Sequence, residues 1–431
     1  SPLLDSSGQS FTLMLAVFIG GLAVGGAISA RLVRGIEKTA VLIWQQLMLA
    51  MAIIGSLLIA DQLPWVLLQL RDGIAADDAG YFSWMLIRVL VSALVMLPVA
   101  VLAGISFPLL LSLVTRNDVS VRNVSMGWKW NVGGTIIGAL AASLFLVPVM
   151  GVRAGLVILG VLTFGTGLYA VIRSGIRRRT VKAKAGMVLI SVVFLVMAGS
   201  AFLRSNHENL FGLAWTLDKN PFETRQEYLR ALAGHTVLFF KEDDELSVSV
   251  TSHKDLRKLS GFSSFEKNDG ALETRTLRVN GKPDASDNIN DMSTQLLLAH
   301  IPLLLHSSPT QVAVVGLGRG TTTGAGLAHH VVASVDTIEI SRAVVLASRY
   351  FSSVNRSYFN DPRSRIFVRD AGIHFSAADK KYDVIISEPS HPWMAGVSRL
   401  FTGDFFYRCR ESLADNGIMA QWVHVAGLSD R

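Results

Sequence analysis

Long apolar runs fill the first half of this chain and limit how it can fold. The runs hold 17 to 30 residues with almost no charge, and a helix of about 20 residues crosses the ~30 Å apolar core of a bilayer. Only 17% of the 431 residues are charged, against about 25% in soluble domains. Because buried helices of soluble proteins are rarely this long and this poor in charge, we predict six membrane spans. They are Phe11–Leu32, Ala40–Ala60, Met85–Val114, Gly127–Met150, Val152–Ile172 and Met187–Leu203.

Glycines inside the predicted spans bear on how the helices pack. Gly21 and Gly25 are four residues apart, and so are Gly134 and Gly138. Small residues at this spacing let two helix backbones approach closely. We therefore predict helix contacts at both pairs.

The charges between the spans predict which side of the membrane each loop faces. The loops after the first, third and fifth spans are basic, and the loop after the second is acidic. Cytoplasmic loops carry an excess of Lys and Arg, so the sixth span is predicted to run outward. We expect a multi-pass protein of a bacterial inner (plasma) membrane, with its soluble half on the non-cytoplasmic side. The basic residues are Arg31, Arg34, Lys38, Arg116, Arg122 and those within Arg173–Lys184.

Composition excludes several classes of partner and site. The net charge of +7 is concentrated in loops between apolar runs, where it indicates membrane topology and not a nucleic-acid surface. The single cysteine, Cys409, excludes an internal disulfide framework and a cysteine metal cluster. We expect no nucleic acid and no metal.

The sequence divides into three expected parts. They are a membrane domain over 1–204, a connector with a small β-strand subdomain over 205–290, and a Rossmann-like domain over 291–431. The chain starts at Ser1 without a methionine and stops at Arg431 shortly after a strand-like run. We expect that the sequence continues at both ends.

Strand signals follow the membrane part in two groups. The first group closes on Asn280-Gly281, a favoured hairpin turn. In the second group, strands alternate with helices from Met292 onward, which predicts a parallel, doubly wound α/β sheet. The first group is Thr236–Phe240, Leu246–Thr251 and Thr276–Val279. The second group is Gln311–Val315, Ser334–Ile340, Arg365–Val368, Val384–Ser387 and Gly417–Trp422, with helices at Arg342–Tyr350 and Thr402–Leu413.

A glycine-rich turn, VVGLGRGTTTG, follows the first strand of the predicted parallel sheet. Gly316, Gly318 and Gly320 would let a ligand approach the backbone and the start of the next helix. Glu339 ends the next strand, where a carboxylate can accept hydrogen bonds from both ribose hydroxyls. These residues predict a nucleotide or nucleoside site.

The third strand narrows the ligand class. Asp370 and Ala371 follow this strand directly, where an acidic side chain can meet the amino group of adenine. The glycine spacing is G-x-G-x-G, whereas dinucleotide sites usually have G-x-G-x-x-G. Together these signals favour an S-adenosyl-type nucleoside over NAD.

The stretch SEPSHPWMAG lies at the carboxyl end of the fourth strand, and ligands bind beyond these ends in open α/β sheets. Glu388 is a candidate general base, and His391 and Trp393 could line a substrate pocket. Two alternatives stay open. Glu388 could instead cap a helix or face solvent in a loop, and His391 before a proline could be only a turn residue.

Several of these strings, in this order, resemble the spermidine synthase family. They are DMSTQLLLAHIPLLLHSSPTQVAVVGLGRGTTTGAG, VDTIEIS, DPRSRIFVRDAG and YDVIISEPSHPWMAGVSRLFTGDFF. More closely, the chain is similar to membrane-fused, spermidine-synthase-like proteins, in which a multi-span region precedes a domain of S-adenosylmethionine-dependent methyltransferase type.

The resemblance implies roles for individual residues. Glu388 stands where the family has an aspartate that positions and deprotonates an attacking amine. In this family the amine attacks the carbon next to a sulfonium in a single in-line displacement. The nucleoside would be S-adenosylmethionine or its decarboxylated form, as co-substrate. It would be held by Gln295, by Gly316, Gly318 and Gly320, by Glu339 at the ribose, and by Asp370 with Ala371 at the adenine.

The sequence also departs from the family pattern at three positions. Arg319, His391 and Thr294 stand where the family usually has two acidic residues and a tyrosine that face the cationic substrates. An arginine beside a sulfonium is unfavourable, but it would pair well with an intact carboxylate. We therefore predict that Arg319 belongs to the nucleoside site and favours S-adenosylmethionine over the decarboxylated compound.

Three functions remain open from the sequence. The first is a membrane-bound transferase that moves an aminopropyl or related alkyl group to an amine. The others are a catalytically degenerate nucleoside-binding or scaffold protein, and a polyamine-related transporter. Expected partners are the lipid bilayer and a small amine or polyamine, with a homo-oligomer left open. S-adenosylmethionine is made in the cytosol, so an active enzyme would be expected to face inward, against the charge bias of the loops.

Overall fold

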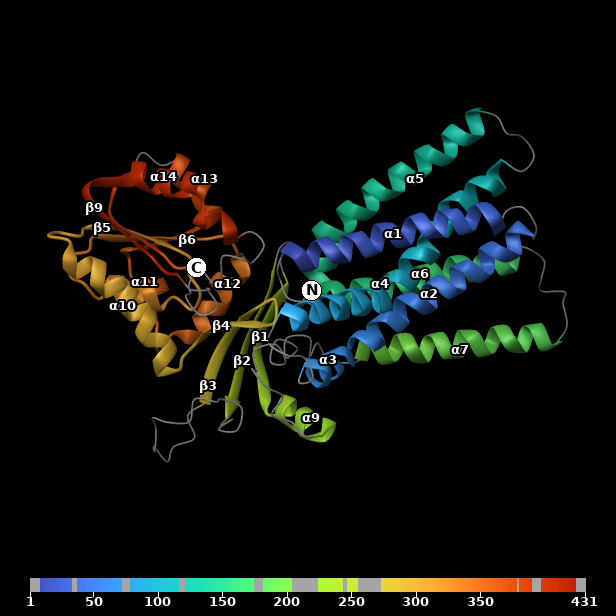
Figure 1. Cartoon of the computed structure of the whole chain (residues 1–431), viewed down its shortest axis with the longest axis horizontal. Coiled ribbons are helices and arrows are strands. Elements are labelled where there is room, and N and C mark those ends of the chain that lie inside the picture. Colours follow the sequence, from blue (N-terminus) through green and yellow to red (C-terminus); the bar gives the residue numbers. More distant parts are fainter. Residues whose placement is uncertain are drawn as a thin grey trace. The chain divides into compact units, whose positions relative to one another are not determined.

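A computed structural model describes the chain over residues 8–32, 37–71, 78–115, 121–173, 181–203, 224–242, 246–254, 273–377, 380–389 and 397–423. The chain divides into two compact units, one over residues 9–208 and one that holds residues 209–431. The first unit is helical, and the second contains two β-sheets (Figure 1).

Apolar helices make up the first unit. Five of its described helical stretches are long and apolar enough to cross a membrane, and they run over Thr12–Leu32, Lys38–Ala60, Phe82–Val114, Val121–Arg173 and Gly186–Leu203. The elements are α1 (Gly8–Leu32), α2 (Lys38–Ala60), α3 (Leu63–Arg71), α4 (Asp78–Val114), α5 (Val121–Ala141), a π-helical turn η1 (Ala142–Leu146), α6 (Val147–Arg173) and α7 (Val181–Leu203).

The sequence predicted six spans, and the described structure has five such stretches because the fourth and fifth predictions fall in one of them. Helical structure is continuous over Val121–Arg173, through α5, η1 and α6. Gly151 interrupts it with φ 80° and ψ 162°, between the two predicted spans. Figure 1 shows α5 and α6 as separate rods.

Glycine packing is found at one of the two predicted pairs. A Cβ added to Gly25 would lie 2.1 Å from the Val101 carbonyl oxygen, and one added to Gly104 would lie 2.3 Å from the Leu22 oxygen. Only glycine allows α1 and α4 to come this close. At Gly134 and Gly138 an added Cβ would meet no atom within 4 Å, so the contact predicted there is absent from the described residues.

Buried polar side chains of the helical unit bond to neighbouring helices. The Gln45 side chain on α2 donates to the Leu102 carbonyl at 2.7 Å and to the Ser106 hydroxyl at 2.8 Å, both on α4. Arg153 on α6 pairs with Asp61 and donates to the Ala201 carbonyl on α7 at 2.9 Å. Such bonds hold helices together where water is scarce.

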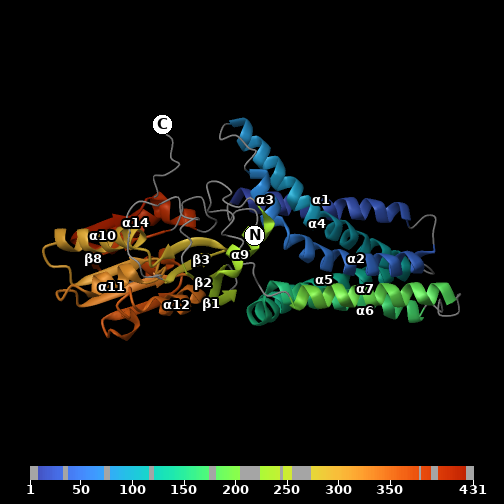
Figure 2. The same ribbon diagram turned by 90° about the horizontal axis from the view of Figure 1, so that it is seen from below.

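The second unit opens with a four-stranded antiparallel sheet in the order β1-β2-β3-β4 (Figure 1 and Figure 2). Asn280 and Gly281, with φ 51° and 79°, form the turn between β3 and β4, as the sequence predicted. The elements are α9 (Arg225–Ala233), β1 (His235–Glu242), β2 (Ser247–Lys254), β3 (Glu273–Val279) and β4 (Lys282–Ser286).

A five-stranded parallel sheet follows, in the order β7-β6-β5-β8-β9. The predicted doubly wound α/β class is confirmed. The elements are α10 (Ile289–Leu305), β5 (Gln311–Val315), α11 (Thr321–Leu327), β6 (Ser334–Glu339), α12 (Arg342–Ala347), η4 (Ser348–Phe351), η5 (Tyr358–Asn360), β7 (Ser364–Val368), α13 (Ala371–Ala377), β8 (Tyr382–Ser387), η6 (Val397–Phe401), α14 (Gly403–Ser412) and β9 (Leu413–Gln421).

Alternate residues of the central strands face two different cores. In β5, Val312 and Val314 pack with α10, α11 and α12 and with the small sheet. Ala313 and Val315 face α13 and α14 on the opposite side. Because β5 lies between β6 and β8, the loops that leave these three strands meet at one edge of the sheet.

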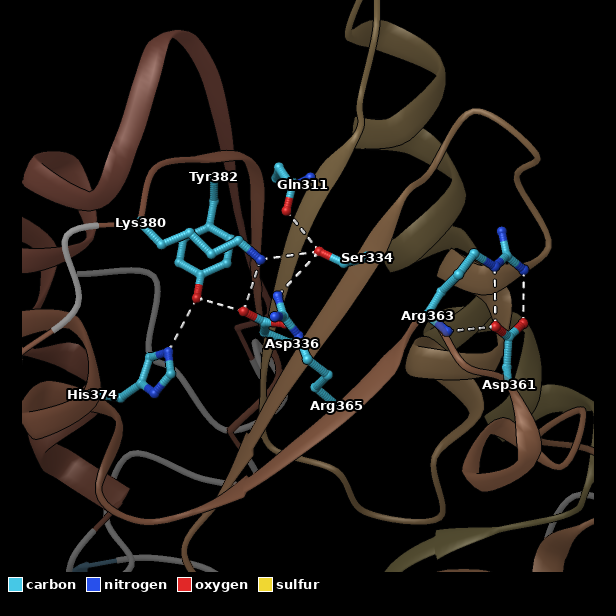
Figure 3. Close-up of polar contacts among 9 residues, drawn as sticks. All are labelled: Gln311, Ser334, Asp336, Asp361, Arg363, Arg365, His374, Lys380 and Tyr382. Carbon is cyan, nitrogen blue, oxygen red and sulfur yellow. Dashed lines mark hydrogen bonds and ion pairs between the residues drawn. The ribbon is translucent and has the colours of Figure 1, made fainter.

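A buried carboxylate ties three strands together on the α13 side. Asp336 of β6 accepts hydrogen bonds from Arg365 Nε at 2.7 Å, from Lys380 Nζ at 2.9 Å and from the Tyr382 hydroxyl at 2.9 Å (Figure 3). The Tyr382 hydroxyl also lies 3.1 Å from His374 Nε2. Since a buried carboxylate is stable only when it is paired and hydrogen-bonded, this network serves the fold.

Candidate functional site

The glycine-rich turn between β5 and α11 has three glycines with positive φ, and they differ in what surrounds them. A Cβ added to Gly316 would lie 2.8 Å from the Glu388 carbonyl oxygen, and one added to Gly320 would lie 2.6 Å from the Tyr358 ring. At Gly318, φ is 51° and an added Cβ would meet nothing within 4 Å. Packing therefore explains Gly316 and Gly320, whereas Gly318 borders open space that a ligand could enter.

Glu339, at the end of β6, accepts a hydrogen bond from the backbone of this turn. One carboxylate oxygen accepts from the Leu317 backbone N–H at 2.9 Å, and the other accepts from the Ser341 N–H at 2.9 Å. Burial raises the pKa of Glu339, and these backbone hydrogen bonds oppose the shift. Each oxygen keeps a lone pair that a ribose hydroxyl could use.

Glu388 follows β8 and approaches α11. Its Oε2 accepts a hydrogen bond from Thr322 Oγ1 at 2.5 Å. Burial raises the pKa of Glu388 to about 7, Asp284 and Asp291 add to the rise, and the Thr322 hydrogen bond and Arg319 oppose it. A carboxylate with a pKa near neutrality can take a proton at physiological pH.

The Arg319 side chain is 0% exposed and lies beside the same acids. Its Nε donates to Thr321 Oγ1 at 2.7 Å, and its Nη1 lies 3.3 Å from Asp291 Oδ2. Within the part of the chain that the structure describes, Nη2 is buried without a hydrogen-bond partner. Burial lowers the pKa of Arg319, while Asp291, Glu388 and Asp287 oppose that shift.

Three acidic residues near Arg319 and Glu388 were not predicted from the sequence. Asp284 lies on β4, Asp287 follows β4, and Asp291 lies in the first turn of α10. Asp284 and Asp291 act on the charge of Glu388, and Asp287 and Asp291 act on Arg319. The run DASDNIND, Asp284–Asp291, was the available signal.

The other residues that the sequence predicted for the site differ in where the structure places them. Gln295 is buried on α10, and its backbone carbonyl lies 3.5 Å from Thr322 Oγ1. Asp370 accepts from the Ile373 N–H at 2.9 Å, at the start of α13, where Ala371 is buried. Thr294 is exposed on α10. His391 and Trp393 lie outside the described residues.

Comparisons with known proteins find relatives of this part of the chain. Residues 292–425 match the spermine/spermidine synthase domain. A polyamine aminopropyltransferase of Thermococcus onnurineus is 35% identical over 121 residues, which are 28% of this chain and 43% of that protein. A spermidine synthase of Dictyostelium discoideum is 33% identical over 142 residues, 32% of this chain and 49% of that protein. The chain thus spans less than half the length of these two relatives.

One relative extends over nearly the whole chain. Polyamine aminopropyltransferase 1 of Streptomyces coelicolor is 24% identical over 444 aligned positions, 96% of this chain and 76% of that protein, so the match includes most of the helical unit. A solved spermidine synthase in complex with the transition-state analogue AdoDATO matches with a TM-score of 0.37 and 23% identity, over 42% of this chain and 56% of that one.

The C-terminal part of this chain thus matches the spermine/spermidine synthase domain and is homologous to polyamine aminopropyltransferases, and long apolar helices precede it.

Proposed function

We propose that this protein is a membrane-bound transferase that binds an S-adenosylmethionine-type nucleoside at the glycine-rich turn and passes an aminopropyl or related alkyl group to an amine. The observation that carries the proposal is Glu388, a carboxylate with a pKa of about 7 held 2.5 Å from Thr322 beside that turn. A base is needed there, because an amine that forms a new bond to carbon must lose a proton.

The nucleoside fits the residues on two grounds. Gly318 borders open space where any side chain would intrude, and Glu339 lies at the end of the neighbouring strand with its carboxylate fixed by two backbone N–H groups. When bound, the nucleoside supplies a carbon next to sulfonium, at which the amine forms a C–N bond while the C–S bond breaks and methylthioadenosine leaves. Glu388 accepts the proton of the amine, and the protein otherwise provides proximity.

The acids around Glu388 favour a cationic acceptor. Asp284 and Asp291 act on Glu388, and Asp287 lies close enough to act on Arg319. A small amine or polyamine carries ammonium groups that such carboxylates attract. The domain's relatives named above are polyamine aminopropyltransferases, and we extend that acceptor class to this chain.

Arg319 supports a finer assignment of the nucleoside. Its buried Nη2 has no hydrogen-bond partner in the described residues, and a buried donor without an acceptor costs about 1–3 kcal/mol. A ligand carboxylate would satisfy it, and decarboxylation removes that group. We therefore infer a preference for S-adenosylmethionine over the decarboxylated form.

A degenerate nucleoside-binding protein is the second candidate, and one observation favours it. Arg319 already pairs with Asp291, so the site can be held together without a substrate. A transporter has less support, because Gln45 and Arg153 in the helical unit bond to neighbouring helices and thereby serve packing.

The full-length protein in detergent can distinguish these functions. Incubation with labelled S-adenosylmethionine or its decarboxylated form and a set of amines should release methylthioadenosine, and Glu388→Gln should abolish the release. Calorimetry with methylthioadenosine should show binding that Glu339→Ala weakens by about 1–3 kcal/mol. Binding without turnover in any arm would support the degenerate protein, and no binding at all would reject both.

A further inference from the structure

Arg319 and Asp291 place a positive and a negative group side by side next to the glycine-rich turn. Arg319 Nη1 lies 3.3 Å from Asp291 Oδ2, and the arginine side chain is 0% exposed. Its Nη2 is also buried and has no hydrogen-bond partner in the described residues. A buried donor without an acceptor is costly, and an anionic oxygen would satisfy this one through a charge-assisted hydrogen bond.

Asp291 keeps one oxygen for a ligand. Among the described residues, every hydrogen bond to its side chain goes to Oδ2, from the Ser286 backbone N–H, from the Ser286 hydroxyl and from Arg319. The side chain is 37% exposed. Because Oδ2 is already occupied, Oδ1 is the atom that can accept a hydrogen bond from an ammonium group that enters the site.

The two residues together match the end of an amino acid, where a carboxylate and an ammonium group are bonded to the same carbon. S-adenosylmethionine carries both groups at the end of the chain that is bonded to its sulfonium. The decarboxylated form carries only the ammonium group. Gly318, next to Arg319, borders open space, so a nucleoside bound at the turn can bring this chain to both side chains.

We propose, on the basis of the function proposed above, that the group passed to the amine is the complete aminocarboxypropyl chain of S-adenosylmethionine. Arg319 holds its carboxylate, and Asp291 holds its ammonium group. Asp284 and Asp287 then remain as the acids that attract the acceptor. This assignment goes beyond a preference for the donor, because it defines the product as an amine that carries an α-amino acid.

The reaction balances without any further reactant. The amine nitrogen uses its lone pair to form a bond to the chain carbon next to sulfur. The electrons of the breaking C–S bond go to sulfur, so methylthioadenosine leaves as a neutral thioether. Glu388 accepts the proton that the amine loses. An aminopropyl transfer follows the same steps, and only the carboxylate on the chain distinguishes its product.

Two labelled forms of the donor show which group moves. The full-length protein in detergent is incubated with putrescine, cadaverine or spermidine and with S-adenosylmethionine labelled in the carboxyl carbon or in the methyl group. The carboxyl label should appear in the amine product, and the methyl label should stay in methylthioadenosine. A methyl label in the amine, or transfer from the decarboxylated donor alone, overturns the proposal. The second result leaves the transferase function intact, whereas no transfer from either donor contradicts that function and this inference together.

Binding of the amino acid end gives a second readout that needs no acceptor. In calorimetry, Asp291→Asn should weaken binding of S-adenosylmethionine about tenfold. It should not weaken binding of an analogue in which hydrogen replaces the α-amino group, and unchanged binding of methylthioadenosine reports folding. Asp404→Asn is the matched control, because Asp404 is 71% exposed on α14, which packs on the opposite face of the sheet. Equal loss of both ligands in Asp291→Asn, or no loss of either, overturns the role of Asp291.

Discussion

Thr322 and Glu388 are joined by a 2.5 Å hydrogen bond from the threonine hydroxyl to carboxylate Oε2. The two residues lie on different elements, Thr322 on α11 and Glu388 just after β8. The bond, together with the close approach of the Glu388 carbonyl to Gly316, fixes the carboxylate against the glycine-rich turn. Because Thr322 engages Oε2, we expect Oε1 to be the atom that accepts the proton of the amine.

The first prediction concerns the pH at which this base works. A hydrogen bond to the charged form lowers the pKa of a carboxyl group, so Thr322→Val should raise the pKa of Glu388 above its value of about 7. The acid limb of the pH–rate profile should move up by about one pH unit, and the rate at pH 7 should fall about fivefold. Thr322→Ser keeps the hydroxyl and should keep the profile. A loss that is equal at every pH would mean that Thr322 only supports the fold.

The second prediction links the same carboxylate to stability. Burial raises the folded-state pKa of Glu388 from 4.5 to about 7, so its stability contribution is present below pH 4.5 and is lost as pH rises through 7. Glu388→Gln should remove this loss. The variant should be more stable than wild type at pH 8 by about 1–3 kcal/mol, a value reduced for partial exposure of the side chain, and nearly equal to wild type at pH 5. Thermal unfolding of the solubilised protein at both pH values measures the difference, and a gap that does not depend on pH would contradict it.

The local pattern of apolar and polar residues in the sequence was enough to predict the parallel sheet, but it did not predict every residue of the candidate site. Strands β5 to β8 are short apolar runs, and the helix–strand alternation fixes their class. The Asn280-Gly281 turn follows from its residues alone, since both have positive φ. The predicted strand Gly417–Trp422 begins later than β9, because a break in the β8–β9 register separates Leu413 from Ile418. An irregularity of strand pairing produces no periodic pattern of apolar residues, so the start of β9 could not be predicted from the sequence.

The missed site residues depend on tertiary packing. Thr322 is one of three consecutive threonines, and only the fold brings its hydroxyl to Glu388. Asp284 and Asp291 reach the site because the small sheet packs against the same core as α10 and β5. At Gly134 and Gly138 the sequence predicted a contact that the structure does not have. Their spacing predicted a close helix contact, and the described residues contain none there. Small residues permit close packing, but a partner helix must be present.

The third prediction concerns the charge at Arg319. Calorimetry should show tighter binding of S-adenosylmethionine than of its decarboxylated form, with methylthioadenosine, which lacks the tail, as the reference. Arg319→Gln should lower affinity for S-adenosylmethionine about tenfold, the value of one charge-assisted hydrogen bond, and leave methylthioadenosine binding unchanged. Retained methylthioadenosine binding also shows that the variant is folded.

A reversal of charge extends this test. Arg319→Asp should shift the preference toward the decarboxylated compound. The new carboxylate would lie beside Asp291, so Asp291→Asn is added in the same chain to remove the repulsion between the two. Wild-type preference for the decarboxylated form would refute the role of Arg319 while leaving nucleoside binding and transfer intact.

The last prediction is the sidedness of the second unit, which depends on how often residues 121–173 cross the membrane. A single 53-residue helix would be about 80 Å long, far more than the ~30 Å core, whereas α5 and α6 at about 32 and 40 Å are each long enough to cross alone. The non-helical Gly151 lies where a reversal would have to occur. Two crossings there place the basic loops around Lys38, Arg122 and Arg173 on one side, as the excess of positive charge in cytoplasmic loops requires. We therefore expect six crossings and a second unit that faces away from the cytoplasm.

Reporter fusions in a bacterial host separate the two topologies. A reporter active only outside the cytoplasm should be active when fused after Gly151 or after Arg431, and inactive when fused after Arg177. If residues 121–173 cross only once, the fusion after Arg177 becomes active and the one after Arg431 becomes silent, since the basic loop and the second unit exchange sides. That result would place the second unit in the cytosol, where S-adenosylmethionine is made, and the charge argument for an outward-facing domain would be wrong.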